Sequence, residues 1–218
     1  VRAPQYKFGW DFGPRFIGCG ITAPITIHLW NDLKIESVSV EQRELTSNKT
    51  ELNFNCAVRS TKQQVAKLEI INSNTGAKES KTITLVPGNN SIVQKHTITD
   101  PKLWWCNGYG HPYLYSFIIR ISLPNGETLS QTKKIGIRKI ELVQKEDPFG
   151  KSFNFQLNGV PVFIRGANMI PPDIIKQNKK DVEFPLIAKN NHMNMLRVWG
   201  GGTYCSNEFY NKCNELGI

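Results

Sequence analysis

The sequence predicts a mainly β chain, with a β-sandwich of the immunoglobulin type in its middle and the opening of an α/β unit at its end. Two observations carry this prediction. Between about residues 25 and 140, Thr, Val, Ile and aromatic residues alternate with polar ones, and turn residues recur about every ten positions. After residue 139 this alternation gives way to strand-length apolar runs separated by segments with helical spacing.

The middle region contains seven candidate strands in about a hundred residues. Turn-forming linkers separate several of them: residues 74–76 read NTG, residues 87–89 read PGN and residues 124–126 read PNG. This count and spacing match an immunoglobulin-like sandwich, although no Cys-Trp-Cys core marks an antibody domain. The candidate strands are 35–42, 51–59, 64–72, 78–85, 91–98, 113–123 and 127–137.

Residues 1–30 do not fit into this sandwich, which already has its strands, because they are dense in Gly, Pro and aromatic residues. We expect them to belong to a preceding domain. The chain opens with VRAP, without Met or an apolar leader, which predicts a segment of a longer gene product.

The C-terminal third alternates between strands and helices. Residues 153–157, 162–165 and 195–199 are candidate strands, residues 179–190 are amphipathic, and residues 206–216 have helical spacing with plausible start and stop signals. Such alternation predicts parallel strands joined by crossover helices. Two core strands cannot close a sheet or bury both of its faces. We therefore expect an unfinished α/β unit that is mobile, readily proteolysed or covered by another copy when the chain is isolated.

Composition argues against several classes of function. The chain has 27 Lys and Arg against 18 Asp and Glu, but the basic residues are scattered, with no stripe interleaved with exposed aromatics, which disfavours nucleic-acid binding. Five cysteines form no C-x-x-C pair and four histidines have no ligand-like spacing, so we predict no metal, no cofactor and free, buried thiols. The apolar runs are far shorter than the roughly 18 residues that span a bilayer, which predicts no membrane segment.

Two stretches lie where an α/β barrel concentrates its chemistry, at the ends of candidate parallel strands. Residues 164–173 read IRGANMIPPD, and residues 195–202 read MLRVWGGG. The glycines after Trp199 lack the spacing of phosphate-binding loops. They would instead leave the face of Trp199 open, as a sugar-stacking platform requires. A buried core indole is the alternative for Trp199, and the sequence alone leaves both open.

Four motifs resemble those of β-mannosidases in glycoside hydrolase family 2. Residues 8–16, FGWDFGPRF, are similar to FGWDWGP, with Phe12 in place of Trp, and residues 104–110, WWCNGYG, resemble WWPNGxG, with Cys106 in place of Pro. Residues 165–173 are similar to R/K-G-A/S-N-W-I-P-x-D, with Met169 in place of Trp. Residues 196–217 resemble LRVWGGGxY…FY…CDELG. Together the motifs extend over the whole chain in the family's order.

This resemblance implies a fold and an activity. Residues 1–30 would be the end of a jelly-roll sugar-binding domain, 31–140 the immunoglobulin-like sandwich, and 141–218 the first β/α units of a TIM barrel. The activity would be that of a retaining exo-β-mannosidase, which removes terminal β-mannose from oligosaccharides with two catalytic glutamates. In the family both glutamates follow the third barrel strand, so this chain alone is expected to be inactive and to have little affinity for sugar.

The resemblance also assigns part of a substrate-binding shell. Trp10 would offer an apolar wall and Asp11 would accept hydrogen bonds from sugar hydroxyls. Arg197 would keep the nucleophile ionised and oriented, and Trp199 would wall the glycosyl pocket. Asn168 and Asp173 would border it from the first barrel strand. The predicted site residues are Trp10, Asp11, Asn168, Asp173, Arg197 and Trp199.

Two alternatives stay open. Trp104, Trp105 and Tyr109 would form a glycan platform if the chain were a non-catalytic carbohydrate-binding module, whereas a structural role would place this loop at the junction of sandwich and barrel. Within the enzymes, a β-galactosidase or an exo-glucosaminidase is the alternative, and the Trp-Gly-Gly after Arg197 favours a mannosidase over a galactosidase. The sequence leaves open the aglycone, the compartment (periplasmic or secreted in a bacterium, lysosomal in an animal) and the oligomeric state, including a homo-oligomer.

Overall fold

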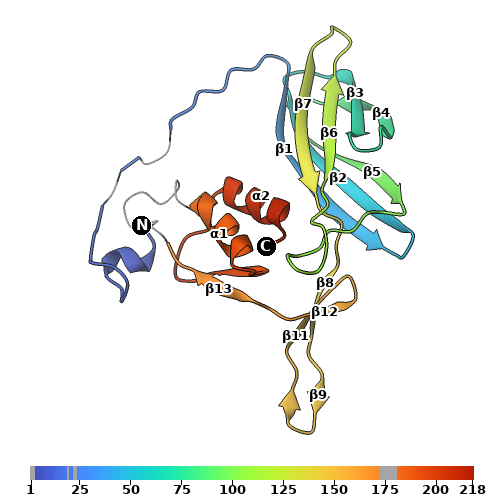
Figure 1. The fold of residues 1–218 in the computed structure, drawn as a ribbon. Helices are drawn as coiled ribbons and strands as arrows, with labels where there is room; N and C mark the ends of the chain where they lie inside the picture. Colours follow the sequence, from blue (N-terminus) through green and yellow to red (C-terminus); the bar gives the residue numbers. More distant parts are fainter. Residues whose placement is uncertain (1–2, 19, 22–23, 172–180) are drawn as a thin grey trace. The chain divides into compact units, whose positions relative to one another are not determined.

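The computed structural model describes residues 3–18, 20–21, 24–171 and 181–218, and they form a mainly β chain, which confirms the predicted class (Figure 1). Its contacts divide the chain into two compact units. Unit 1 comprises Val1–Ile25, Trp104–Tyr113 and Arg138–Ile218, and unit 2 comprises Thr26–Leu103 and Leu114–Ile137.

Unit 2 is a sandwich of two antiparallel sheets, as the strand pattern predicts. One sheet has the order β1-β2-β5 and the other the order β4-β3-β6-β7 (Figure 1). Two predicted strands, 64–72 and 78–85, are reproduced to the residue, and the others differ only at their ends. The strands are β1 (Leu33–Leu45), β2 (Lys49–Ser60), β3 (Gln64–Asn72), β4 (Lys78–Leu85), β5 (Gly88–Thr99), β6 (Tyr115–Ser122) and β7 (Thr128–Ile135).

The core of unit 2 follows from the alternation of its sequence. Along β2 every second side chain points inward, and Leu52 and Phe54 are fully buried. Phe117 and Ile119 of β6, in the other sheet, are also fully buried. The rings of Phe54 and Phe117 meet edge to face with their centroids 4.9 Å apart. Apolar side chains from both sheets therefore interdigitate in one layer.

One carboxylate of the sandwich is almost completely covered by basic side chains. Glu69 of β3 lies 2.6 Å from Lys78 and 2.9 Å from Lys67, and its side chain is only 7% exposed. Hydrogen bonds from Lys78 and Lys67 lower the pKa of Glu69 to about 2. The carboxylate is therefore ionised wherever the sandwich is folded at neutral pH.

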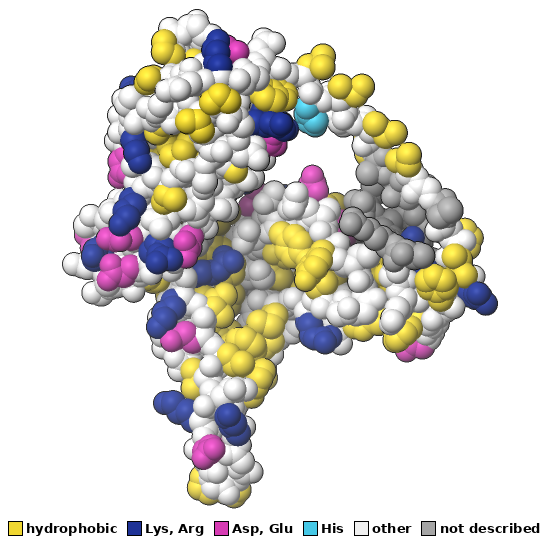
Figure 2. Space-filling view, turned by 180° about the vertical axis from the view of Figure 1, so that it is seen from behind, with side chains coloured by type: hydrophobic (Ala, Val, Ile, Leu, Met, Phe, Trp, Pro, Cys, Tyr) yellow, Lys and Arg dark blue, Asp and Glu magenta, His cyan; other side chains and the backbone are white. Residues whose placement is uncertain are grey.

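Unit 1 contains a small antiparallel sheet with the order β12-β11-β8. Its strands are β8 (Ile140–Val143), β11 (Asn154–Leu157) and β12 (Val160–Val162), and the hairpin β9 (Glu146–Asp147) and β10 (Gly150–Lys151) lies between β8 and β11 along the chain. Figure 2 shows hydrophobic side chains on the surface near the base of this hairpin. The exposed apolar residues of this part are Ile140, Leu142, Phe149, Phe153, Val160 and Phe163.

The end of unit 1 has the predicted order of strand, helix, strand and helix. β13 (Gly166–Met169) pairs in parallel with β14 (Met195–Val198), and α1 (Phe184–Asn190) and α2 (Asn207–Leu216) follow the two strands (Figure 1). Short 3-10 helices, η1 (Gln5–Phe8) and η2 (Asp181–Glu183), lie near the start of the chain and before α1.

Two boundaries in this region differ from the prediction. The predicted strand 162–165 is wrong, because Val160–Val162 pairs antiparallel with β11 and the parallel strand begins only at Gly166. The predicted amphipathic segment 179–190 is helical over Asp181–Glu183 and Phe184–Asn190, and residues 179–180 lie outside the described residues.

The last helix ends and begins as its sequence indicates. Ser206 is the N-cap, because its Oγ accepts a hydrogen bond of 3.2 Å from the backbone N–H of Phe209. Gly217 is the C-cap with φ of 80°, a left-handed conformation that glycine adopts without strain.

The described cysteines are free, as expected. Cys56 and Cys106 are buried, whereas Cys205 and Cys213 are half-buried, and Cys19 lies outside the described residues. Burial raises the pKa of Cys56 to about 11, so its thiol stays protonated at neutral pH. None of the described helices is long and apolar enough to cross a membrane.

Candidate functional site

A group of four aromatic residues surrounds the end of β14. Trp199 follows this strand directly, and its ring centroid lies 5.3 Å from Trp10, 5.6 Å from Phe12 and 6.1 Å from Tyr6. We call Tyr6, Trp10, Phe12 and Trp199 the aromatic cluster. Tyr6 is fully buried, Trp199 is half-buried and Trp10 is 48% exposed. Of the two tryptophans, Trp10 therefore has the side chain more accessible to solvent.

A tight turn carries Trp10 and places Asp11 beside it. The backbone N–H of Trp10 donates to the carbonyl of Gly13 at 3.3 Å, and the N–H of Gly13 donates back to Trp10 at 3.2 Å. Asp11 is exposed within this turn. A carboxylate at such a position is free of the protein interior and can accept hydrogen bonds from a ligand.

The glycines after Trp199 lie against its indole. A Cβ atom at Gly201 would clash with the six-membered ring of Trp199, and one at Gly202 would lie 3.3 Å from both that ring and Pro171. The expectation that glycine leaves a face of Trp199 open is therefore met only in part. Absence of a side chain at Gly201 instead allows the backbone to pack directly on the ring.

A polar pair lies on one face of the parallel strands. Arg197 of β14 and Asn168 of β13 are register partners, and Nη1 of Arg197 donates a hydrogen bond of 3.2 Å to Oδ1 of Asn168. Both side chains are exposed and border a shallow hollow of about 310 Å³. Because side chains alternate along a strand, Leu196 and Val198 point the other way. They line a separate apolar hollow of about 230 Å³ that also includes Phe209 of α2.

The structure thus brings the predicted site residues together as two pairs. Trp10 contacts Trp199, and Asn168 contacts Arg197, which lies on β14 two residues before Trp199. Asn168 lies within β13. Asp173 lies outside the described residues.

Three residues of this region escaped the sequence analysis. Tyr6 and Phe12 complete the aromatic cluster, and the aromatic density of residues 6–16 is the signal that could have indicated it. Asn194 is buried just before β14, where its Oδ1 accepts from the N–H of Arg165 at 2.9 Å and its Nδ2 donates to the carbonyl of Phe163 at 3.0 Å. It thereby fixes the start of β14 to the segment before β13, a role that has no sequence pattern.

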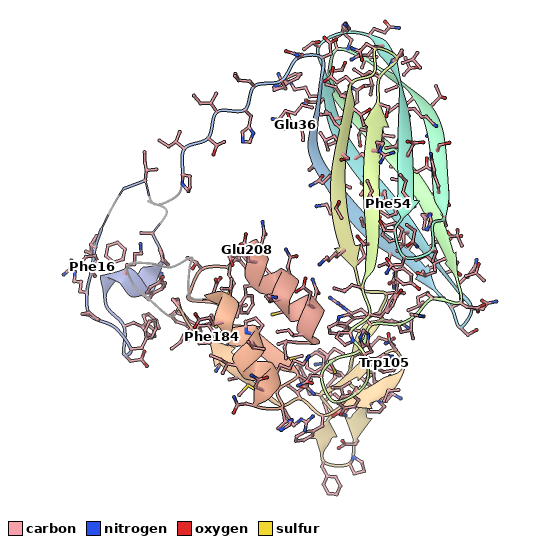
Figure 3. All side chains as sticks on the ribbon, turned by 45° about the horizontal axis from the view of Figure 1, so that its top comes forward. Phe16, Glu36, Phe54, Trp105, Phe184 and Glu208 are labelled. Carbon is pink, nitrogen blue, oxygen red and sulfur yellow. The ribbon has the colours of Figure 1, made fainter. Side chains whose placement is uncertain are left out.

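The loop that joins β5 to β6 uses its aromatic groups inside unit 1. Trp104 is buried, its Nε1 donates to the carbonyl of Asn214 at 2.7 Å, and the guanidinium of Arg138 lies 4.3 Å from the ring centroid. Burial lowers the pKa of Arg138. The hydroxyl of Tyr109 accepts from the N–H of Phe163 at 2.8 Å. These rings therefore do not match an exposed glycan platform, and the half-buried Trp105 lies in the same loop (Figure 3).

Asn107 of this loop holds the ends of both helices. Its Nδ2 donates to the carbonyls of Lys189 at 3.2 Å and Met193 at 2.9 Å, and its N–H donates to the carbonyl of Gly217 at 2.7 Å. A Cβ atom at Gly217 would lie 2.9 Å from the backbone nitrogen of Asn107, so the close approach requires glycine.

Acidic and metal-binding groups give no second centre in the described part of the chain. Glu215, which follows Asn214, pairs with Lys212 at 3.2 Å on α2. Among the residues that the structure describes, no three His, Cys, Asp or Glu side chains gather closely enough to hold a metal ion.

Comparisons with known proteins agree on one family. Residues 33–138 match the model for glycosyl hydrolases family 2. The whole chain is 36% identical, over 232 residues, to β-mannosidase B of Aspergillus flavus and covers 26% of it. The chain therefore spans about a quarter of the length of the curated relatives it matches.

Two solved structures illustrate the likeness in three dimensions. The crystal structure of β-D-mannosidase from Dictyoglomus thermophilum matches the whole chain with a TM-score of 0.91 and 37% identity, and the match covers 27% of that protein. An exo-chitosanase from Amycolatopsis orientalis matches 86% of the chain, and 22% of its own, with a TM-score of 0.71 and 20% identity. At that identity the second likeness concerns the fold alone.

Proposed function

Because this chain belongs to glycosyl hydrolase family 2, we propose that its full-length protein is a retaining exo-β-mannosidase acting on oligosaccharides that end in β-mannose. The observation that carries this proposal is the contact of Trp10 with Trp199, directly after the strand β14 that presents Arg197. The names of the relatives supply the sugar, since the 36% and 37% identical proteins are both β-mannosidases.

In this proposal Trp10 is the ring that meets the sugar. Its indole is 48% exposed, whereas Trp199 is half-buried behind it, so Trp10 has the open face that a pyranose C–H surface can cover. Trp199 acts as the wall against which Trp10 is packed. Asp11, exposed in the same turn, accepts hydrogen bonds from sugar hydroxyls.

In this proposal Arg197 keeps the nucleophilic carboxylate ionised and fixes its orientation. It donates one N–H to the neutral amide of Asn168, which leaves other donors of its guanidinium for a carboxylate. A guanidinium beside a carboxylate lowers the pKa of the acid and fixes its orientation, as a nucleophile at neutral pH requires. Retaining hydrolysis needs two carboxyl groups roughly 5 Å apart, and we assign them to a later part of the full-length protein. The role of Asp173 at the border of the pocket rests on the motif resemblance alone, because this residue lies outside the described ranges.

The domain assignment is part of the same proposal. Residues 1–30 are the end of a jelly-roll domain, residues 31–140 the immunoglobulin-like sandwich and residues 141–218 the start of the catalytic barrel. The parallel pairing of β13 with β14 supports the last assignment, because active sites of such barrels lie at the carboxyl ends of their strands.

The proposal is tested with the full-length protein and a panel of 4-nitrophenyl glycosides. We expect the highest kcat/KM on the β-mannoside, with β-mannose as the first product seen by proton NMR, and no turnover by the 218-residue chain alone. Higher kcat/KM on the β-galactoside or β-glucosaminide would replace the proposed specificity. First release of the α-anomer would overturn retention.

Removing the exposed ring tests the role of Trp10. In the full-length protein Trp10→Ala should lower kcat/KM by a factor equivalent to about 2–3 kcal/mol of transition-state stabilisation. This is the free energy gained by burying one large aromatic side chain. Phe16→Ala is the matched control, since Phe16 is 50% exposed in the same segment but lies outside the aromatic cluster (Figure 3). Equal losses in both variants would remove Trp10 from the site.

Removing the carboxylate tests the role of Asp11. We expect Asp11→Ala to lower kcat/KM by a factor equivalent to about 2–4 kcal/mol of transition-state stabilisation, if the hydrogen bonds from the sugar to Asp11 tighten in the transition state. Asp11→Asn keeps one acceptor and should lose less. Wild-type kinetics in Asp11→Ala would exclude this residue from sugar binding.

A further inference from the structure

The buried carboxylate of Asp181 joins two segments of unit 1, the 3-10 helix η2 and the start of α2 at Ser206. Asp181, in η2, is only 2% exposed. Its Oδ2 accepts a hydrogen bond of 2.6 Å from the backbone N–H of Ser206, and its Oδ1 accepts one of 3.1 Å from the Ser206 hydroxyl. A buried carboxylate is costly unless such bonds compensate it, so this contact is a specific one.

Ser206 extends this contact into α2. Its hydroxyl donates to Asp181 and at the same time accepts from the N–H of Phe209, as the N-cap of the helix. The negative charge of Asp181 lies close to the N-terminus of α2, where the helix dipole favours it. The 3-10 helix η2 contacts both α1 and α2. Figure 3 labels Phe184 and Glu208, which lie in the first turns of these two helices.

The segment that Asp181 holds is the loop from Trp199 to Ser206. At its first end the N–H of Trp199 donates to the carbonyl of Met169 at 3.0 Å. Its middle contains Gly200, Gly201 and Gly202, which have no side chains with which to pack, and Tyr204 is 90% exposed. The loop is hydrogen-bonded at both ends, and Asp181 supplies the contact at the second end.

Gly201 and Gly202 of this loop pack on the indole of Trp199. A loop that is loosened at Ser206 would withdraw this backbone from one side of the ring. Trp10 contacts Trp199 from the N-terminal segment at 5.3 Å and would lose a fixed partner. The position of the sugar-facing ring is thus coupled, through contiguous contacts, to the hydrogen bonds of Asp181.

We propose that Asp181 is a positioning residue of the glycosidase site, which fixes the 199–206 loop and thereby holds Trp199 against Trp10. This inference rests on the proposed function, since it concerns the same sugar pocket. Asp181 itself does not touch the sugar. Its loss should therefore weaken binding of the glycoside far more than it slows the chemical step.

The test compares variants of the full-length protein on a 4-nitrophenyl β-mannoside. Asp181→Ala should raise KM about tenfold and change kcat by less than about threefold. Asp181→Asn should return KM to within about threefold of wild type, because its amide can accept from the Ser206 N–H and donate to the Ser206 hydroxyl. Glu183→Ala is the matched control, since Glu183 is exposed in the same 3-10 helix and its side chain makes no capping bond to α1, and it should leave KM and kcat unchanged.

A second measurement does not depend on activity. Chymotrypsin cleaves after exposed tyrosines, and cleavage after Tyr204 should become about tenfold faster in Asp181→Ala than in wild type or Glu183→Ala, because local opening of the loop becomes easier. An inactive wild-type protein would overturn the proposed function, while the cleavage rates would still decide whether Asp181 fixes the loop.

Three results would overturn the positioning role. The first is an unchanged KM and an unchanged cleavage rate in Asp181→Ala. The second is a lower kcat and less soluble protein at constant KM, which is the signature of a purely structural residue. The third applies if Asp181→Ala does not fold. Ser206→Ala removes one of the two bonds to Asp181 together with the N-cap bond from Phe209, and the positioning role requires it to raise both KM and the cleavage rate after Tyr204 by about two- to threefold. Wild-type KM and wild-type cleavage in Ser206→Ala would overturn the role.

Discussion

The sandwich of unit 2 and the parallel strand pair of unit 1 differ in how many of their side chains are buried. In β2 and β6 every second residue is buried, and Phe54, Phe117 and Ile119 are fully inaccessible. In β13 only Met169 is buried, and no residue of β14 reaches that state. Two of the proposed site residues, Asn168 and Arg197, lie on this second, open pair.

This difference in burial indicates that unit 2 contributes mainly to stability, whereas the parallel strand pair of unit 1 carries residues of the proposed site. Burial in unit 2 is a property of two complete sheets, each of which covers the other. The parallel pair is held by neighbours that are not strands: Asn194 at its start, the aromatic cluster at its end and the helices on one face. Its other face stays open, where a polar pair remains accessible to a ligand.

Hydrogen exchange of the 218-residue chain can break this comparison most directly. We expect amides of β2 and β6 to exchange at least about 100-fold more slowly than those of β13 and β14, because core strands open only with global unfolding. Mass spectrometry of peptic fragments resolves these segments. Strong, uniform protection from residue 153 to 218 in a monomer would show that unit 1 is as complete as the sandwich.

Truncation of the central ring pair should give the largest loss of stability in a single variant. Phe54, labelled in Figure 3, loses its contact with Phe117 in Phe54→Ala, and the free energy of unfolding should fall by about 3–5 kcal/mol. Urea denaturation followed by circular dichroism measures it. Val93→Ala, at a 46% exposed position of β5, serves as the control and should cost less than about 1 kcal/mol.

Loss of one amide tests how unit 1 is held without a complete sheet. Asn107→Ala removes the two side-chain bonds to the carbonyls of Lys189 and Met193 and should raise the rate of exchange at the end of α1, equivalent to about 1–2 kcal/mol. The amides of β2 should keep their exchange rates. An effect of equal size in the sandwich would contradict the division into units that respond separately.

The smallest expected effect concerns pH. The pKa of Glu69 is lowered to about 2 in the folded state, so its contribution to stability is present above its unfolded pKa, near 4.5, and is lost as pH falls from there toward 2. Glu69→Gln should therefore cost about 1–2 kcal/mol at pH 7 and progressively less below pH 4.5. Glu41→Gln, in a half-exposed pair with Arg43, should cost less than about 0.5 kcal/mol at either pH. A cost for Glu69→Gln that does not vary with pH would contradict the ion pairing of Glu69.

The sandwich could be predicted from the sequence because its information is local. Alternation with period two, interrupted by turn residues, determines where β3 and β4 begin and end, and both match to the residue. The longer β1 and β5 extend beyond the predicted ends because cross-strand pairing continues past the alternating segment, for example at Lys34 and Asn89, which carry no apolar period. The helix α2 was equally readable from Ser206 and Gly217.

The start of the parallel pair could not be predicted in this way. Residues 160–164 form a nearly continuous apolar run, VPVFI, in which periodicity cannot distinguish an edge of one sheet from a strand of the next. The choice is made by pairing partners, β11 for Val160–Val162 and β14 for Gly166–Met169. Motif resemblance located Trp10, Arg197 and Trp199, but not Tyr6, Asn194 or Asp181, whose roles depend on contacts between distant segments.

The loop between β5 and β6 makes the two units inseparable by a single cut. The chain leaves unit 2 after Leu103, contributes Trp104–Tyr113 to unit 1 and returns to unit 2 at Leu114. A recombinant sandwich that ends before Arg138 would still carry this ten-residue loop, with Trp104 and Asn107 deprived of their partners Asn214 and Met193. An exchange of unit 1 between relatives must therefore transfer residues 104–113 together with the C-terminal part of that unit, which requires replacement at two places in the chain.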